Sequence, residues 1–181
     1  MRTLPKQITM LQFRRRLLGL CLMPILMACL DATLTLAAQS KEYWAGNYAR
    51  ANEMSPTFHQ LLAYHPLAFV AGDAGWILIF TGMILLMPQT LALIMSIAVT
   101  LGHTGGAASS LLFRHPYGYQ VSCGLCLLVA VGLAVGIRWG WRAEPQSDAP
   151  VGARLPFGLR WAVIVALFGI AVYLYLWPRR P

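Results

Sequence analysis

Charged residues are scarce in this sequence, where they make up 11% of the 181 positions. A soluble globular domain carries about 25% charged residues. Too few polar side chains are present to cover a water-facing surface, so an ordinary soluble domain is excluded. Lysine and arginine outnumber aspartate and glutamate by 14 to 6. The basic residues stand at the ends of apolar runs, where they contact lipid head groups and set topology, and we therefore expect no nucleic-acid partner.

Cysteine is also scarce, and the four cysteines are too few for a disulfide framework. Cys123 and Cys126 form a C-x-x-C motif at the start of an apolar run. A helix N-terminus favours the reactive thiolate, and membrane enzymes that pass electrons between disulfides and quinone carry a similar pair. Those enzymes normally carry a second pair in an outer loop, which this sequence lacks. We expect two structural cysteines, with a membrane thiol-disulfide oxidoreductase as an alternative.

A long hydrophilic segment is absent as well, so we expect a single transmembrane domain over 1–181. Apolar runs fill most of the chain instead. A run of about 20 residues crosses the hydrocarbon core of a bilayer as a helix. The sequence therefore predicts an all-α, polytopic membrane protein with a bundle of about five transmembrane helices, at residues 17–38, 66–86, 90–113, 119–141 and 160–177.

The orientation follows from the lysines and arginines, which are enriched in cytoplasmic loops. With the N-terminus inside, most of them lie on the cytoplasmic side, including those in the predicted cytoplasmic loop 142–159. Arg179 and Arg180 run against this trend. We expect a multi-pass protein of the inner (plasma) membrane with the long loop 39–65 outside. A cleaved first segment is the alternative, because Leu26–Cys29 resembles a lipoprotein cleavage box.

Two aspartates lie inside apolar runs, where an ionisable side chain is expensive and usually faces a partner or a water cavity. Asp31 lies seven residues before Ala38, and Asp73 lies seven residues after Pro66. Each carboxylate is therefore about 10 Å below the same surface. By the same rise per residue, His103 reaches the layer just beneath the two aspartates. We expect the two aspartates to face each other, with His103 lining the same polar pocket in the outer half of the bundle.

Carboxylates and an imidazole at one depth suit several roles. They can hold helices together through hydrogen bonds, or they can bind a metal or move a proton. The leading expectation is a non-enzymatic membrane-complex subunit or a small-ligand or lipid-binding protein, whose partners are the lipid bilayer and other membrane subunits. The alternative is a metal-dependent intramembrane hydrolase that uses Asp31, Asp73 and His103 as catalytic residues and metal ligands, with Glu53 as a further candidate. The sequence identifies no cofactor.

The sequence also predicts how two further segments pack. Residues 56–64 predict a short interfacial helix with Phe58, Leu61 and Leu62 facing lipid, while His59 and Gln60 face water. The small residues of 102–110 predict close packing of the third helix against its neighbours.

Three elements follow one another along the first part of the chain: Asp31-x-x-Leu34-Thr35, Ala51-Asn52-Glu53-x-x-Pro56 and His65-Pro66-Leu67. This order resembles a family of small, uncharacterised prokaryotic multi-pass membrane proteins with Asp and Thr in the first helix and a Glu-x-Asn-Pro-like loop. The resemblance covers about residues 25–112, and Ser55 stands where the family pattern has Asn. It implies that Asp31 and Glu53 are positions of interest, and it implies no activity.

The orientation predicts that a cysteine at Ser40, in a cysteine-free background, reacts with a membrane-impermeant thiol reagent in intact cells. A cysteine at Ser147, in the predicted cytoplasmic loop, should react only after lysis. The reverse labelling pattern would overturn the orientation.

Overall fold

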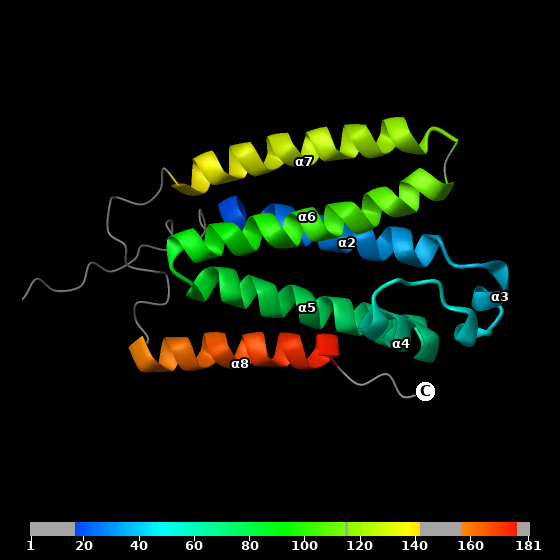
Figure 1. The fold of residues 1–181 in the computed structure, drawn as a ribbon, viewed down its shortest axis with the longest axis horizontal. Coiled ribbons are helices and arrows are strands. Elements are labelled where there is room, and N and C mark those ends of the chain that lie inside the picture. Colours follow the sequence, from blue (N-terminus) through cyan, green and yellow to red (C-terminus); the bar gives the residue numbers. More distant parts are fainter. Residues whose placement is uncertain (1–16, 115, 142–156, 177–181) are drawn as a thin grey trace, which may run out of the picture.

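The computed structural model describes residues 17–114, 116–141 and 157–176, which form helices and short connections and contain no β-strand. The predicted all-α architecture is therefore confirmed. Long helices run roughly along one axis (Figure 1), namely α2 (Leu22–Ala37), α5 (Pro66–Leu86), α6 (Gln89–Arg114), α7 (Gly118–Trp141) and α8 (Phe157–Leu176). Most of the predicted cytoplasmic loop, together with Arg179 and Arg180, lies outside the described residues.

Within the described residues, four helices are long and apolar enough to cross a membrane: Leu18–Ala37, Pro66–Leu86, Gln89–Leu112 and Gly118–Trp139. The fold is that of an all-α polytopic bundle. The predicted fifth run is also helical, and it begins at Phe157, three residues earlier than expected. Its crossing of the membrane stays a prediction.

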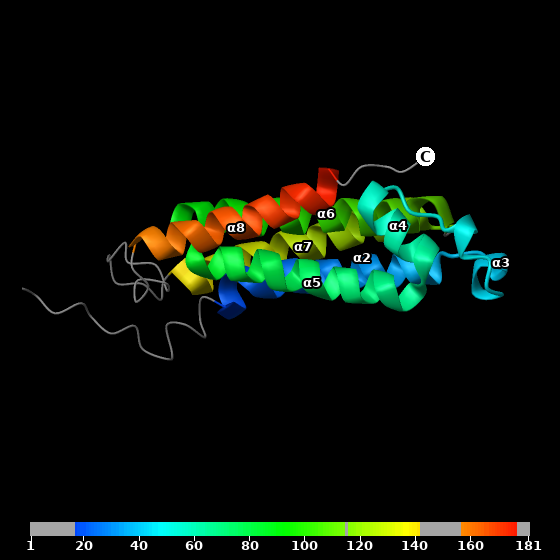
Figure 2. The same cartoon turned by 90° about the horizontal axis from the view of Figure 1, so that it is seen from below.

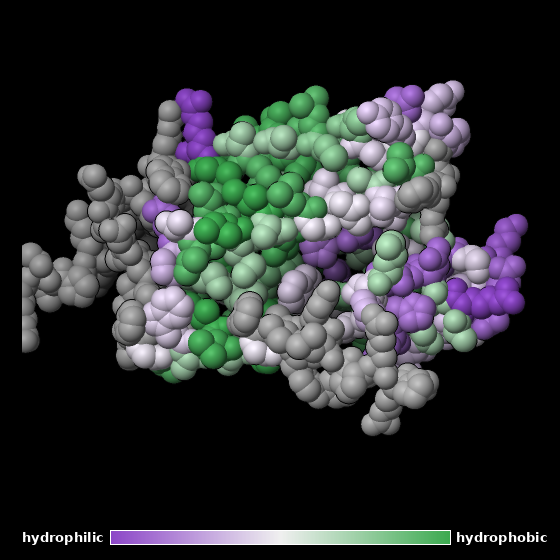
Figure 3. Space-filling view, in the orientation of Figure 1, coloured by the Kyte–Doolittle hydropathy of each residue, from purple (hydrophilic) through white to green (hydrophobic). Residues whose placement is uncertain are grey.

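The helices pack as a bundle around α2 and α6. The α2 helix contacts α5, α6 and α7, and α8 packs along α5 (Figures 1 and 2). Hydrophobic residues cover much of the face drawn in Figure 3. Hydrophilic residues gather at the end where loop 39–65 lies and in a hollow beside it. The bundle therefore presents apolar side chains to lipid and a polar region at one end.

Pro24 shapes the start of the first crossing. Proline has no N–H, so it cannot donate to the carbonyl of Leu20, four residues earlier, as an α-helix requires. The chain forms a π-helical segment there, η1 (Leu17–Cys21). The hydroxyl of Ser96 on α6 donates to the Leu20 carbonyl at 2.6 Å. This bond satisfies a buried backbone group that water cannot reach, and it joins α2 to α6.

Glycine allows α7 to approach the start of the first crossing closely. A Cβ on Gly136 would lie 2.6 Å from the carbonyl oxygen of Gly19. A Cβ on Gly124, at the other end of α7, would meet nothing within 4 Å. The position of α7 against η1 therefore depends on the missing side chain of Gly136.

Prolines also set the ends of two helices. Pro66 occupies the first turn of α5, where its missing N–H needs no partner, and the His65 side chain caps the helix by accepting from the Leu67 N–H. Met87, which precedes Pro88, is extended and separates α5 from α6. The predicted separation of the helices at 66–86 and 90–113 is therefore confirmed.

Loop 39–65 contains three short helical elements, which are α3 (Lys41–Trp44), η2 (Tyr48–Arg50) and α4 (Pro56–Tyr64). The predicted helix over 56–64 is confirmed, but the expectation that its apolar side chains face lipid is wrong. Leu62 is fully buried, and Phe58 and Leu61 pack against its cluster with Tyr43 and Phe69. The apolar face of α4 covers α5 instead of facing lipid, because burial against a helix removes the same surface from water as burial in lipid does.

Candidate functional site

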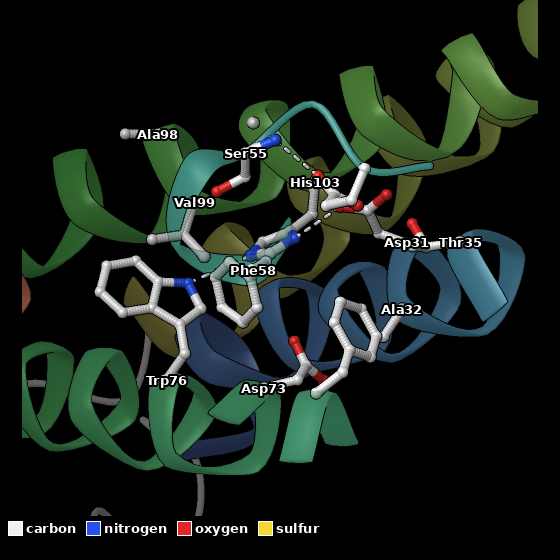
Figure 4. Close-up of a pocket in the computed structure, with 13 residues that line it drawn as sticks. Asp31, Ala32, Thr35, Ser55, Phe58, Asp73, Trp76, Ala98, Val99 and His103 are labelled. Atoms are coloured by element: carbon white, nitrogen blue, oxygen red, sulfur yellow. Dashed lines mark hydrogen bonds and ion pairs between the residues drawn. The ribbon is translucent and has the colours of Figure 1, made fainter. Parts of the chain in front are cut away.

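A cavity of about 530 Å³ lies beneath loop 39–65, in the half of the bundle nearest that loop (Figure 4). Its walls come from α2, α4, α5, α6 and the segment before α4. Three carboxylates line it, from Asp31, Glu53 and Asp73, and we call it the acidic cavity. His103 lines the same space, as the depth argument predicted.

Trp76, His103 and Asp31 form a chain of hydrogen bonds from α5 through α6 to α2. The indole Nε1–H of Trp76 donates to Nε2 of His103 at 3.3 Å, and Nδ1 of His103 lies 3.0 Å from Oδ2 of Asp31. Indole nitrogen is only a donor, so Nε2 of the imidazole must be the acceptor. The neutral ring therefore carries its proton on Nδ1, and this N–H donates a hydrogen bond to Asp31.

Gly106 makes room for the Asp31 carboxylate on α6. A Cβ at this position would lie 2.5 and 2.6 Å from the two carboxylate oxygens of Asp31. A Cβ on Gly105 or Gly102 would meet nothing within 4 Å. The predicted close packing of the small residues is therefore confined to part of the 102–110 run, and its tightest position is the one that accommodates Asp31.

Asp73 differs from Asp31 because no other described residue makes a hydrogen bond to its carboxyl group. The residue is only 9% exposed, and it lines the acidic cavity. It shares one face of α5 with Phe69 and Trp76, four residues before it and three after it. The structure thus brings Asp31, Asp73 and His103 to one cavity, while only Asp31 is directly bonded to His103.

Glu53 reaches the cavity because the loop is fastened to the end of α2. The amide of Gln39 donates to the carbonyl of Asn52 at 3.0 Å and accepts from the Asn52 N–H at 2.8 Å. The carboxylate of Glu53 accepts from the Ser55 N–H at 2.7 Å. A neighbouring cavity of about 370 Å³ shares Asp31, Thr35 and Glu53 with the acidic cavity. The three residues therefore lie between two adjacent cavities.

Tyr43 anchors the other arm of the loop. Its side chain is fully buried, and its hydroxyl donates to the Leu62 carbonyl at 3.0 Å. Burial raises the pKa of the Tyr43 phenol, with a smaller contribution from Tyr48, so the hydroxyl keeps the proton that this bond needs. The bond ties α3 to α4 above the cavity.

The geometry gives no support to a metal site at Asp31, Asp73 and His103. In the described ranges, no three side chains of His, Cys, Asp or Glu are grouped so that they could hold a metal ion. Both ring nitrogens of His103 are engaged, one with Asp31 and one with Trp76. A metal ligand or a general base needs a free lone pair on the imidazole. The lone pair on Nε2 already accepts a hydrogen bond from the Trp76 indole.

The C-x-x-C pair lies elsewhere. Cys123 and Cys126 are exposed on α7, and neither lines the acidic cavity nor the neighbouring one. Both are free thiols. The redox role of this pair therefore stays a prediction without a structural link to the polar site.

Several residues that build the site were not predicted from the sequence. Trp76 is the most important of them, and a signal for it was present: it follows Asp73 by three residues, which places both on one helix face. Phe69 was detectable in the same way. Gln39 gave no signal, because its role depends on where the loop returns to α2.

Comparison of the chain with protein-family models, with curated proteins and with solved structures finds no match.

The bond between His103 and Asp31 predicts unequal effects for two substitutions at position 31. Asp31→Asn keeps an acceptor for the His103 N–H, and we expect a loss of about 1 kcal/mol in the free energy of unfolding. Asp31→Leu leaves that N–H unpaired, and the loss should be larger by about 1–3 kcal/mol. Unfolding in detergent measures both values.

Thr33→Ala provides the control, because Thr33 is exposed on α2 and its hydroxyl bonds only within its own helix. Its effect should stay within about 0.5 kcal/mol. Equal losses for Asp31→Asn and Asp31→Leu would show that the negative charge is required, and not the hydrogen bond.

Proposed function

We propose that this chain is a non-enzymatic, multi-pass membrane protein that binds a small ligand in the acidic cavity. The cavity supports this proposal by its size, since small-molecule sites usually measure about 300–1,000 Å³. It also combines apolar and aromatic walls with a few polar groups, which is typical of such sites. The observation that carries the proposal is Asp73, a buried carboxylate that lines the cavity without a hydrogen-bonding partner among the described residues.

A binding role fits the polar groups better than catalysis does. The imidazole of His103 is fixed between Trp76 and Asp31, so it holds no free lone pair toward a nucleophile or a water. Hydrolysis and metal chemistry both need one. The hydrogen-bond chain supports a second role in the same proposal, which is to keep α2, α5 and α6 at the spacing that leaves the cavity open.

The proposal also assigns the cavity to one side of the membrane. We place the N-terminus in the cytoplasm and the chain in the inner (plasma) membrane, on the distribution of lysine and arginine. The ligand then enters from the outside, past loop 39–65. Asp31 and Glu53, which carry the family resemblance, both line the cavity, and we propose that members of that family share this site.

The ligand site is testable through Trp76, whose indole lines the cavity. Purified protein in nanodiscs should be screened against small cations, anions and neutral compounds for thermal stabilisation and for a change in tryptophan emission. A ligand at about 100 times its dissociation constant stabilises the folded state by about 2.7 kcal/mol. We expect at least one compound to give both signals, and Trp76→Phe to remove the emission change.

Trp44→Phe is the matched control, because Trp44 is exposed in α3 and lies outside the cavity. It should leave the response unchanged. A screen in which no compound stabilises the protein, or an emission change that disappears with Trp44→Phe but persists with Trp76→Phe, would contradict the proposal.

A further inference from the structure

We infer that the ligand of the acidic cavity is an organic ammonium ion, with its charged nitrogen beside Asp73 and its apolar part against the aromatic wall. This inference rests on the proposed function and adds the chemical class of the ligand. It follows from two features of the site, which are the unpaired carboxylate and the aromatic rings around it.

The charge in the cavity is one-sided. Asp31, Glu53 and Asp73 line it, and no lysine or arginine is found among the described lining residues. Asp31 already accepts a hydrogen bond from His103, and Glu53 accepts one from the Ser55 N–H. Asp73 has no such bond to any described residue. An unpaired carboxylate inside an apolar bundle is energetically unfavourable, and a bound cation would remove that cost.

The direction of Asp73 agrees with this role. Figure 4 shows its carboxylate pointing into the space between Trp76 and Ala32, toward the side of the cavity where Asp31 lies. Asp31 and His103 line the same cavity as Asp73, although neither is bonded to it. A cation beside Asp73 therefore lies in the field of two carboxylates, while only one of them needs to contact it.

The walls of the acidic cavity are aromatic near the Asp73 carboxylate. Phe58 of α4 and Phe69 of α5 form an edge-to-face pair with ring centroids 5.8 Å apart, and both line the cavity with Trp76. Aromatic faces attract ammonium groups. They also bury the carbon atoms of a ligand. This combination distinguishes an organic cation from an inorganic one, which would find only scattered oxygen atoms.

A bare metal ion fits the same space less well. Calcium takes six to eight oxygen ligands and magnesium needs a near-octahedral set, whereas the described residues offer no group of three acidic, histidine or cysteine side chains for a metal. An anion would face three carboxylates. A neutral compound would leave Asp73 unpaired, and it is therefore the rival that an experiment must separate.

Three probes that each carry a phenyl group on a two-carbon chain separate these classes: 2-phenylethylamine, 2-phenylethanol and 3-phenylpropanoate. Their dissociation constants should be measured by tryptophan emission and calorimetry on the full chain in phosphatidylcholine nanodiscs, with empty nanodiscs as the blank. We expect the amine to bind at least about tenfold more tightly than the alcohol or the carboxylate, a difference of about 1.4 kcal/mol.

Asp73→Asn tests the residue that holds the charge. It should weaken binding of the amine by about tenfold or more and leave binding of the alcohol unchanged. Glu42→Gln removes one exposed carboxylate at the same end of the bundle, away from the cavity, and should change neither. If Asp73→Asn does not yield folded protein, Phe69→Leu provides a second test, because it keeps apolar volume, removes the aromatic face and should weaken the amine more than the alcohol.

The outcomes separate this inference from the function on which it rests. Equal affinities for the amine and the alcohol, or an unchanged amine affinity in Asp73→Asn, overturn the ammonium inference while a small-ligand site remains. Binding of the carboxylate alone does the same. The absence of binding by these probes and by every compound of the wider screen overturns both.

Discussion

A carboxylate inside an apolar helix bundle needs a hydrogen-bonding partner, and the arrangement of the helices in this protein depends on the partner of Asp31. The partner is His103, which is itself fixed by the indole of Trp76. Because the three residues belong to α2, α6 and α5, one short chain of hydrogen bonds joins three helices. When helices separate in lipid, the polar groups that made such bonds lose their partners. The bonds therefore favour a single arrangement of the bundle.

Other features of the bundle meet the same requirement. Gly106 leaves room for the Asp31 carboxylate on α6. Ser96 satisfies the Leu20 carbonyl that Pro24 cannot bond, and Gln39 fastens the loop that carries Glu53. Each lets a polar group lie beside its partner, and for Asp31 and Leu20 this happens inside the helix bundle, where water is scarce. Asp73 is the exception, because no other described residue bonds to its carboxyl group, and the proposal of a ligand rests on this difference.

The depth of residues along a helix was predictable from the sequence, and their rotation about the helix axis was not. Counting residues from the helix ends placed Asp31 and Asp73 in one layer and His103 just beneath it, and all three line one cavity. Counting did not show that His103 turns to Asp31 and accepts from Trp76. The apolar face of α4 was likewise predicted, but the surface that it covers depends on the path of the loop. The bonds of Gln39 to Asn52 join residues 13 positions apart, which no local pattern reveals.

The tautomer of His103 tests the hydrogen-bond chain most directly. Nitrogen-15 NMR of protein labelled at histidine, with His103→Gln to assign the signal, distinguishes a protonated Nδ1 from a protonated Nε2. We predict one neutral tautomer with the proton on Nδ1, and a changed Nε2 signal in Trp76→Phe, because that variant removes the donor. A proton on Nε2, or an Nε2 signal that does not respond to Trp76→Phe, would contradict the chain that joins the three helices.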